Sequence, residues 1–321
     1  MRVALVGAGA LGRAYGVRLA AARDEVSFVV RAARVAETAP FAIEQVNGAK
    51  RRDVIERPRR FAEVPGDADI VIVAVRFDQL DQTGPGSVAE LLRAAPDRPV
   101  VLLTPSMPAQ KAALEQAIGR RQILAAMPGV SGYIDERDVV RYWLTGVAAT
   151  LIETPDPHHT PPEHRAAIEE LTRRLTNADV PTRLERDVAT LNTATTTAFF
   201  PLIAAIDAGG GVDGILSDKA LLSTALEAAK ECDALARKLG KIAPWAHMLT
   251  RFVGPFTLKP GVALARRLFP EAVRFVELHF GPKLHDQHLA MGTSILALGV
   301  EHGIPLPALD RLLRLIAQAG R

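Results

Sequence analysis

Cysteine is nearly absent from this sequence. The 321 residues include one cysteine, Cys232, so no disulfide can form within the chain and a framework of internal crosslinks is excluded. This scarcity favours a reducing compartment, and we expect the protein to be cytoplasmic. Cys232 lies in a helical pattern, where a small buried hydrophobic side chain is its expected role.

Long apolar runs and strong charge are also missing. No stretch approaches the run of about 18 apolar residues that a membrane span requires, so we expect no membrane partner. The net charge of +3 is small, and the arginines are dispersed along the chain. This distribution argues against a nucleic-acid partner. Arg13 and Arg18 interrupt the apolar N-terminal segment, which argues against a secretory signal.

What the sequence does contain is a glycine-rich turn at its start, MRVALVGAGALGRAYG. The apolar run 2–6 predicts a buried strand, and Leu11, Tyr15 and Leu19 predict one packed face of a following helix. The GxGxxG between them consists of Gly7, Ala8, Gly9, Ala10, Leu11 and Gly12.

The chemistry of such a turn follows from its glycines and from the helix that it starts. The first glycine permits a sharp turn, the second lets a pyrophosphate approach the backbone, and the third lets the helix and the strand pack closely. The unpaired N–H groups and the positive dipole end of the helix favour an anion. We therefore predict dinucleotide binding, the alternative being a plain packing turn.

Further apolar segments alternate with helical patterns along the first half of the chain. Strands are predicted at 26–30, 69–75, 99–103, 123–126 and 146–153, and helices at 79–95 and 107–117. Strands buried on both faces and joined by helical crossovers predict an α/β fold with a doubly wound parallel sheet of the Rossmann type. Ligands of such sheets bind beyond the carboxyl ends of the strands.

Residues 1–185 are expected to form this dinucleotide-binding domain. A helix over 161–177 and a strand over 181–185 would close it, and the preceding proline-rich TPDPHHTPPEH predicts a loop with solvated His158 and His159. Residues 186–321 change character, because helical patterns replace strand patterns. We expect an all-α domain there that binds the substrate and can form a homodimer.

Two helices of this second domain differ in how clearly the sequence marks them. The pattern from Lys219 to Leu239 has one apolar face and ends before Gly240, a suitable C-terminal cap. The pattern over 188–206 contains several threonines, which are poor helix formers.

Arg31 follows the second predicted strand, at the position that distinguishes the two nicotinamide dinucleotides. An acidic side chain there binds the ribose 2′-hydroxyl of NAD, whereas an arginine accepts the 2′-phosphate of NADP. Arg31, with Arg34 close behind it, therefore predicts NADP. The alternative is an ordinary surface arginine.

In its architecture the chain resembles the ketopantoate reductases (2-dehydropantoate 2-reductases) over its whole length. The segments that carry the resemblance are GAGALG at 7–12, Arg31, VIVAVRFDQ at 71–79, FPLIAAI at 200–206 and EHGIPLP at 301–307. The resemblance implies an N-terminal Rossmann domain and a helical C-terminal domain. It also implies that Arg76 and Gln79 contact the cofactor, with arginine replacing the family's usual lysine.

The substrate half departs from the family pattern. The family carries a catalytic lysine where this chain has Asn192, and two asparagines where it has Thr196 and Phe200. The family's C-terminal glutamate falls on Asp286 or, in a second alignment, on Gln287. We therefore expect a divergent member that lacks the catalytic lysine.

A replacement proton donor is predicted in the segment HFGPKLHDQHLAMG, which contains Lys283, His285, Asp286 and His288. In a helix, Lys283 and Gln287 would share a face, as would the two histidines. A histidine paired with a carboxylate is a workable acid near neutral pH. The alternative is a solvated polar helix face. We expect no metal site, because His-Asp-x-His has no third, separated ligand.

The sequence thus predicts an NADPH-dependent oxidoreductase that reduces a small 2-oxo acid or a related carbonyl compound other than ketopantoate. The hydride comes from the nicotinamide, and the chain must supply the proton and the groups that orient it. The rival hypothesis is a non-catalytic protein that senses or sequesters NADP and whose active site has eroded.

Overall fold

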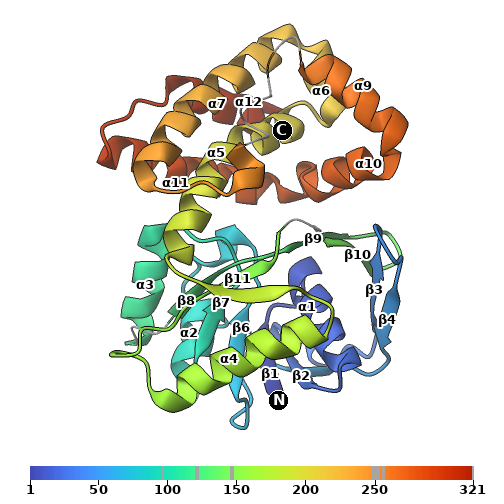
Figure 1. Ribbon diagram of the computed structural model, residues 1–321, viewed down its shortest axis with the longest axis vertical. Helices are drawn as coiled ribbons and strands as arrows, with labels where there is room; N and C mark the ends of the chain where they lie inside the picture. The colour runs from blue at the N-terminus through green and yellow to red at the C-terminus, as the bar shows by residue number, and fades with distance from the viewer. Residues whose placement is uncertain (96, 120–122, 145–147, 248–253, 255–256, 320–321) are drawn as a thin grey trace. The chain divides into compact units, whose positions relative to one another are not determined.

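The computed structural model describes residues 1–95, 97–119, 123–144, 148–247, 254 and 257–319 (Figure 1). The chain divides into two compact units, Met1–Ala189 and Thr190–Arg321. The division falls in the first turn of helix α5 (Val188–Ala208), close to the boundary that the sequence suggests after residue 185.

The first unit is built on an eight-stranded sheet. In sheet order its strands are β12 (Thr182–Glu185), β11 (Thr150–Glu153), β8 (Ile123–Met127), β7 (Val100–Leu102), β6 (Ile70–Val73), β1 (Arg2–Val6), β2 (Glu25–Val29) and β5 (Arg59–Phe61). All neighbouring strands are parallel except β8 and β11, which are antiparallel. The predicted α/β fold with a doubly wound, Rossmann-type sheet is confirmed.

Helices cover both faces of this sheet. Val3 and Leu5 face α1 (Ala10–Ala21) and α4 (Pro162–Asn177), whereas Ala4 and Val6 belong to the core beneath α2 (Val88–Ala94) and α3 (Pro108–Ile118). Alternate residues of one strand thus enter two different cores, which is why the strands read as continuous apolar runs.

The helix predicted over 79–95 is wrong in its first half. Phe77–Gln79 forms the short 3-10 helix η2, and α2 begins only at Val88. Gly84 and Gly86 have positive φ values of 92° and 78°, which interrupt a right-handed helix. Ser87 then starts α2 by accepting a hydrogen bond from the Glu90 N–H.

A second, four-stranded sheet was not predicted. Its order is β4 (Arg52–Ile55), β3 (Phe41–Gln45), β10 (Val139–Leu144) and β9 (Val130–Ile134). All four strands contact α1, which also packs on β1 and β2. The helix is therefore buried around its circumference and not along the single face that the sequence suggests. Arg13 and Arg18 are each only 2% exposed as a result.

The regular secondary structure among the described residues of the second unit is entirely helical, which confirms the predicted all-α domain. Beyond α5 it contains α6 (Val212–Ser217), α7 (Lys219–Leu239), α9 (Leu258–Leu268), α10 (Pro270–His279), η3 (Pro282–Leu284), α11 (His285–Glu301) and α12 (Pro307–Ala319). Helix α7 has the predicted bounds and contains the buried Cys232. Its N-terminus is capped by Asp218, whose carboxylate accepts the Ala220 and Leu221 N–H groups.

Helix α5 runs unbroken through its threonines because packing outweighs their weak helix propensity. Thr195 is buried, and its hydroxyl accepts the Ala243 N–H at 2.9 Å. Within the described residues, α5 is also the one helix whose length and hydropathy would allow it to cross a membrane. In this structure 67% of its most apolar window is buried, as in the core helix of a folded unit.

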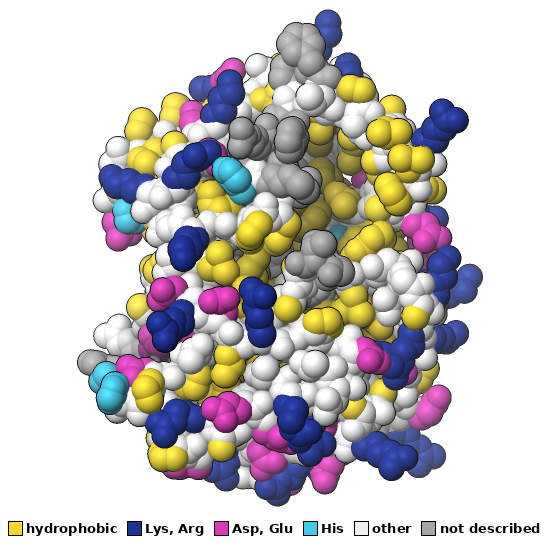
Figure 2. All heavy atoms as spheres, in the orientation of Figure 1, with side chains coloured by type: hydrophobic (Ala, Val, Ile, Leu, Met, Phe, Trp, Pro, Cys, Tyr) yellow, Lys and Arg dark blue, Asp and Glu magenta, His cyan; other side chains and the backbone are white. Residues whose placement is uncertain are grey.

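Charged side chains are mixed over the surface. On the face drawn in Figure 2, lysines and arginines lie among aspartates and glutamates in both units. This distribution agrees with the dispersed charges of the sequence.

Candidate functional site

The strand order of the large sheet reverses between β1 and β6. From β1 the chain continues to β2 on one side, whereas β6 and β7 extend the sheet on the other side. These four strands are parallel, so the loops after their carboxyl ends all leave at one edge. Doubly wound sheets bind their ligands in the crevice at such a point.

The glycine-rich turn lies at this edge, directly after β1. Gly7 has a φ of +102°, and a Cβ there would lie 2.6 Å from the carbonyl oxygen of Ala74 in the loop after β6. A Cβ on Gly12 would lie 2.0 Å from the Gly7 carbonyl oxygen. Neither position has room for a side chain, so the backbone of the turn is held in one conformation.

Gly9 differs from these two glycines. It is exposed at the N-cap of α1, and a Cβ there would have no atom within 4 Å. Ala8 beside it is buried, while Ala10 and Leu11 begin the helix and have N–H groups without acceptors inside it. The open space over Gly9 and these N–H groups make a cradle that fits a pyrophosphate.

Close packing of the helix on the strands depends on Gly16, which lies outside the motif. A Cβ on Gly16 would lie 2.6 Å from Leu5 Cδ1 and from Phe28 Cζ. Gly12 faces the turn itself, and its nearest side-chain atom in β6's loop is Ala74 Cβ at 3.6 Å. The GxxxG spacing from Gly12 to Gly16 was the available signal in the sequence.

Arg31 and Arg34 play different parts in the loop after β2. Arg31 is exposed at the start of the 3-10 helix η1 (Ala32–Arg34), and within the described chain its guanidinium has no hydrogen bond or ion pair. Arg34 donates two hydrogen bonds to the Glu37 carboxylate, at 2.8 and 2.9 Å. This pairing raises the pKa of Arg34 and lowers that of Glu37. Arg31 is thus the cation available to a ligand.

Arg76 and Gln79 come together in the loop after β6. The Arg76 N–H donates to Gln79 Oε1 at 3.1 Å, and the Arg76 guanidinium pairs with Asp78 at 2.8 Å. Both side chains therefore make contacts within the loop itself: Gln79 with its backbone and Arg76 with the Asp78 carboxylate. They lie at the same edge of the sheet as the glycine turn, because β6 is parallel to β1.

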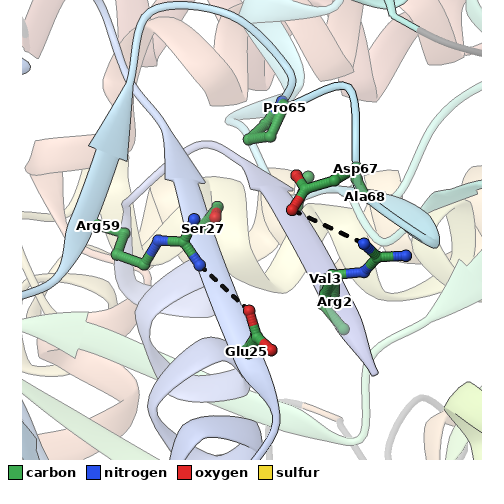
Figure 3. A pocket seen from close by; sticks show the side chains of 9 residues that line it. Arg2, Val3, Glu25, Ser27, Arg59, Pro65, Asp67 and Ala68 are labelled. Atoms are coloured by element: carbon green, nitrogen blue, oxygen red, sulfur yellow. Dashed lines mark hydrogen bonds and ion pairs between the residues drawn. The ribbon is translucent and has the colours of Figure 1, made fainter.

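A small pocket lies at the opposite edge of the sheet (Figure 3). It is lined by residues from the amino-terminal ends of β1 and β2, including Arg2 and Glu25. Arg2 pairs with Asp67 at 3.8 Å, and Arg59 pairs with Glu25 at 3.4 Å. Since the charges in this pocket neutralise one another and the glycine turn lies at the other ends of the strands, the pocket is separate from the candidate site.

In the second unit, the two histidines lie beside a carboxylate other than Asp286, the one that the sequence suggests. His288 Nδ1 lies 2.8 Å from Asp207 Oδ2, and His285 Nδ1 lies 3.4 Å from the same oxygen. Asp286, the neighbour in sequence, is exposed, as is Lys283. Asp207 belongs to α5, 81 residues before His288, and no local pattern could have pointed to it.

The members of this cluster differ in accessibility. The side chains of Asp207 and His288 are each 2% exposed, whereas that of His285 is 23% exposed. The Nε2 atom of His288 is buried and has no hydrogen-bond partner among the described atoms. His285 is therefore the imidazole of the cluster that a solute can reach.

Asn192 lies at the other end of α5 and is buried. Fifteen residues separate it from Asp207, which corresponds to about 22 Å along a helix axis. A small substrate cannot touch both positions, so the structure does not bring Asn192 together with the His285 cluster. Across the described residues, no group of three or more histidine, cysteine, aspartate or glutamate side chains could hold a metal ion.

The comparison with family models matches this glycine-rich unit. Residues 3–153 match the model described as ketopantoate reductase PanE/ApbA. The likeness to that family thus covers just under half of the chain. The match covers the four-stranded sheet, every strand of the large sheet except β12, and the loops after β1, β2 and β6. It confirms the resemblance seen in the sequence. The comparison with curated proteins gives no match.

Solved structures extend the likeness to the full chain. The 2-dehydropantoate 2-reductase from Geobacter metallireducens GS-15 is 21% identical, with a TM-score of 0.66 over 99% of this chain and 100% of that one. D-mandelate dehydrogenase in complex with NADH is 14% identical, with a TM-score of 0.63 over 99% of each chain. A dimeric ketopantoate reductase from Staphylococcus aureus is 15% identical, with a TM-score of 0.65 over 100% and 99%. At these identities the likeness shows the ketopantoate reductase fold.

Proposed function

We propose that this protein is an NADPH-dependent oxidoreductase of the ketopantoate reductase type, reducing a small 2-oxo acid or a related carbonyl compound. The observation that carries the proposal is the cradle at the strand-order reversal, where Gly9 leaves room for a pyrophosphate. The fold shared with D-mandelate dehydrogenase in its NADH complex supports a nicotinamide dinucleotide. Bound NADPH would supply the hydride.

The preference for NADPH rests on Arg31. Its guanidinium is exposed and unpaired within the described residues, whereas the neighbouring Arg34 is committed to Glu37. A 2′-phosphate gains charge-assisted hydrogen bonds from such an arginine, and a 2′-hydroxyl gains far less. We assign Arg76 and Gln79 to the same site through the loop that they stabilise.

The proton donor that we propose is His285, supported by Asp207 and His288. A carbonyl oxygen needs a proton as negative charge develops on it, and an amide such as that of Asn192 is not an acid. Imidazole is an acid in the neutral pH range, and His285 Nδ1 lies 3.4 Å from the Asp207 carboxylate. His288 holds that carboxylate in place at 2.8 Å. Lys283 and Asp286 are exposed in the same segment, and the Lys283 ammonium would attract the carboxylate of a 2-oxo acid.

The substrate is proposed to differ from ketopantoate. Where the resembling family places its catalytic lysine, the buried Asn192 offers a hydrogen bond but no positive charge. The cation that orients the substrate must therefore come from another position. The same burial of Asn192 favours the second candidate function, a protein that binds NADP as a sensor or store without turning over a substrate.

Titration with NADPH and NADH, followed by NADPH oxidation assays with a panel of 2-oxo acids, aldehydes and imines, tests both candidates. We expect tighter binding of NADPH than of NADH and oxidation with at least one 2-oxo acid. Binding of NADPH with no oxidation across the panel would favour the sensor. Binding of neither dinucleotide would overturn both.

We also propose a cytoplasmic homodimer. The likeness in fold to the dimeric ketopantoate reductase from Staphylococcus aureus supports the assembly. Sedimentation equilibrium is expected to give twice the chain mass of 34.5 kDa, and a single-chain mass would contradict the dimer.

A further inference from the structure

Two buried arginines share one aromatic ring in the first unit. The guanidinium carbons of Arg13 in α1 and Arg60 in β5 lie 4.2 and 4.4 Å from the ring centroid of Phe41 in β3. The three residues are 2%, 8% and 0% exposed. Burial of two like charges is costly unless their N–H groups are satisfied. The hydrogen-bond acceptors of these two guanidiniums therefore show which segments of the chain Arg13 and Arg60 stabilise.

Arg13 holds the glycine-rich turn. Its Nε donates to the carbonyl oxygen of Ala8 at 2.9 Å, inside the motif itself. Its Nη1 lies 2.9 Å from the Asp138 carboxylate and donates to the Asp138 carbonyl at 3.1 Å, in the turn between β9 and β10. The second sheet is thereby tied to the backbone that forms the cradle over Gly9.

Arg60 holds the end of the loop that contains Arg31. Its Nη1 donates to the Glu37 carbonyl oxygen, and its Nη2 donates to the Ala39 carbonyl oxygen at 2.5 Å. The segment 31–40 is exposed except at Arg34 and contains only the short η1. Two hydrogen bonds from a buried group therefore anchor an otherwise loosely held segment. Burial lowers the pKa of Arg60. The positive charges of Arg13 and Arg34 lower this pKa further, whereas the negative charge of Glu37 raises it.

We propose that Arg13, Phe41 and Arg60 form a positioning stack for the dinucleotide, in which each arginine sets one of the two loops that grip it. The inference rests on the proposed function. Arg13 sets the turn for the pyrophosphate, which NADH and NADPH share. Arg60 sets the segment that presents Arg31 to the 2′-phosphate, which NADPH alone carries. The two arginines therefore affect affinity and selectivity differently, although they touch the same ring.

The test compares Arg13→Met and Arg60→Met, which keep an unbranched side chain and remove the donors. We expect Arg60→Met to raise the Kd for NADPH roughly tenfold, the loss typical of removing charged hydrogen bonds, with little change for NADH. Arg13→Met should raise both Kd values by a similar factor and leave their ratio unchanged. Arg59→Met is the matched control, because the exposed Arg59 pairs with Glu25 at the opposite edge of the sheet. It should change neither value.

Far-UV circular dichroism and thermal unfolding show whether each variant is folded. Arg60→Lys is the second variant if Arg60→Met does not fold, because an ammonium keeps the charge but lacks the planar fork that spans two carbonyls. It should lower the NADPH to NADH selectivity by a smaller factor. An unchanged selectivity in folded Arg60 variants of a wild type that binds NADPH would overturn the inference alone. A wild type that binds no dinucleotide would overturn the proposed function and the inference together.

Discussion

The two units present their candidate groups in different ways. In the first unit the cradle is made of backbone, and the residues around Gly9 are neighbours in sequence. In the second unit the cluster is made of side chains, and Asp207 meets His285 and His288 from a distant helix. A site of backbone atoms can be recognised from a local motif, whereas a site of side chains depends on how helices pack. The following experiments test whether this contrast extends to function.

The largest effect is expected in the second unit, at the His285 cluster. Asp207→Asn and His285→Ala should slow turnover of the true substrate by roughly 10²–10⁴-fold, because general acid catalysis is lost. The Kd for NADPH should not change. Steady-state kinetics and a fluorescence titration measure the two quantities.

Asp286→Asn separates the two carboxylates of this region. Asp286 is exposed, and the oxygen nearest to the two imidazoles belongs to Asp207. We expect the Asp286 variant to retain turnover. If it lost as much turnover as Asp207→Asn, the pairing seen in the structure would not be the catalytic one.

The glycines of the first unit should separate binding from stability. Gly9→Val is expected to abolish NADPH binding with little change in Tm, since the added side chain meets only open space in the free protein. Gly12→Ala should cost about 1–3 kcal/mol in the free energy of unfolding, because its Cβ would overlap the Gly7 carbonyl. Dinucleotide titration and urea unfolding check the pair, and wild-type binding by folded Gly9→Val would contradict the cradle.

Arg31 and Arg34 offer a smaller and more selective test. Arg31→Ala should weaken NADPH binding by about 1.5–3 kcal/mol, the range for hydrogen bonds to charged groups, and leave NADH binding unchanged. Arg34→Ala should have less effect on the NADPH to NADH ratio, because Arg34 already binds Glu37. An equal loss of selectivity in both variants would mean that Arg31 and Arg34 both contribute to recognition of the 2′-phosphate.

The smallest effect is expected on the surface of α4. Hydrogen bonds from Arg173 and Arg174 lower the pKa of Glu170 from 4.5 to about 2. Because the folded-state pKa is lowered, this stabilisation is present above pH 4.5 and is lost as the pH falls toward 2. The Glu170 side chain is partly exposed, so Glu170→Gln should cost less than about 1 kcal/mol at pH 7. Urea unfolding at pH 7 and pH 2.5 measures the difference, which should shrink at the lower pH.

Local sequence determined the parts of the fold that depend on a few adjacent residues. Gly7 requires a positive φ, and β1 requires side chains that are apolar on both faces, so strand, turn and helix could be predicted together. Helix α7 was predicted with its bounds because its apolar face and Gly240 lie within one short stretch. Arg31 could be placed after β2 because the distance is only a few residues along the chain.

Tertiary structure alone decided which residues meet across long stretches of chain. The second sheet buries Arg13 and Arg18, which read as polar interruptions in the sequence. Asp207 replaces Asp286 as the partner of the histidines because the folded chain brings Asp207 of α5 to 2.8 Å from His288 of α11. The physical reason is the same in each case. Burial and pairing energies depend on neighbours in space, and those neighbours exist only after the whole unit has folded.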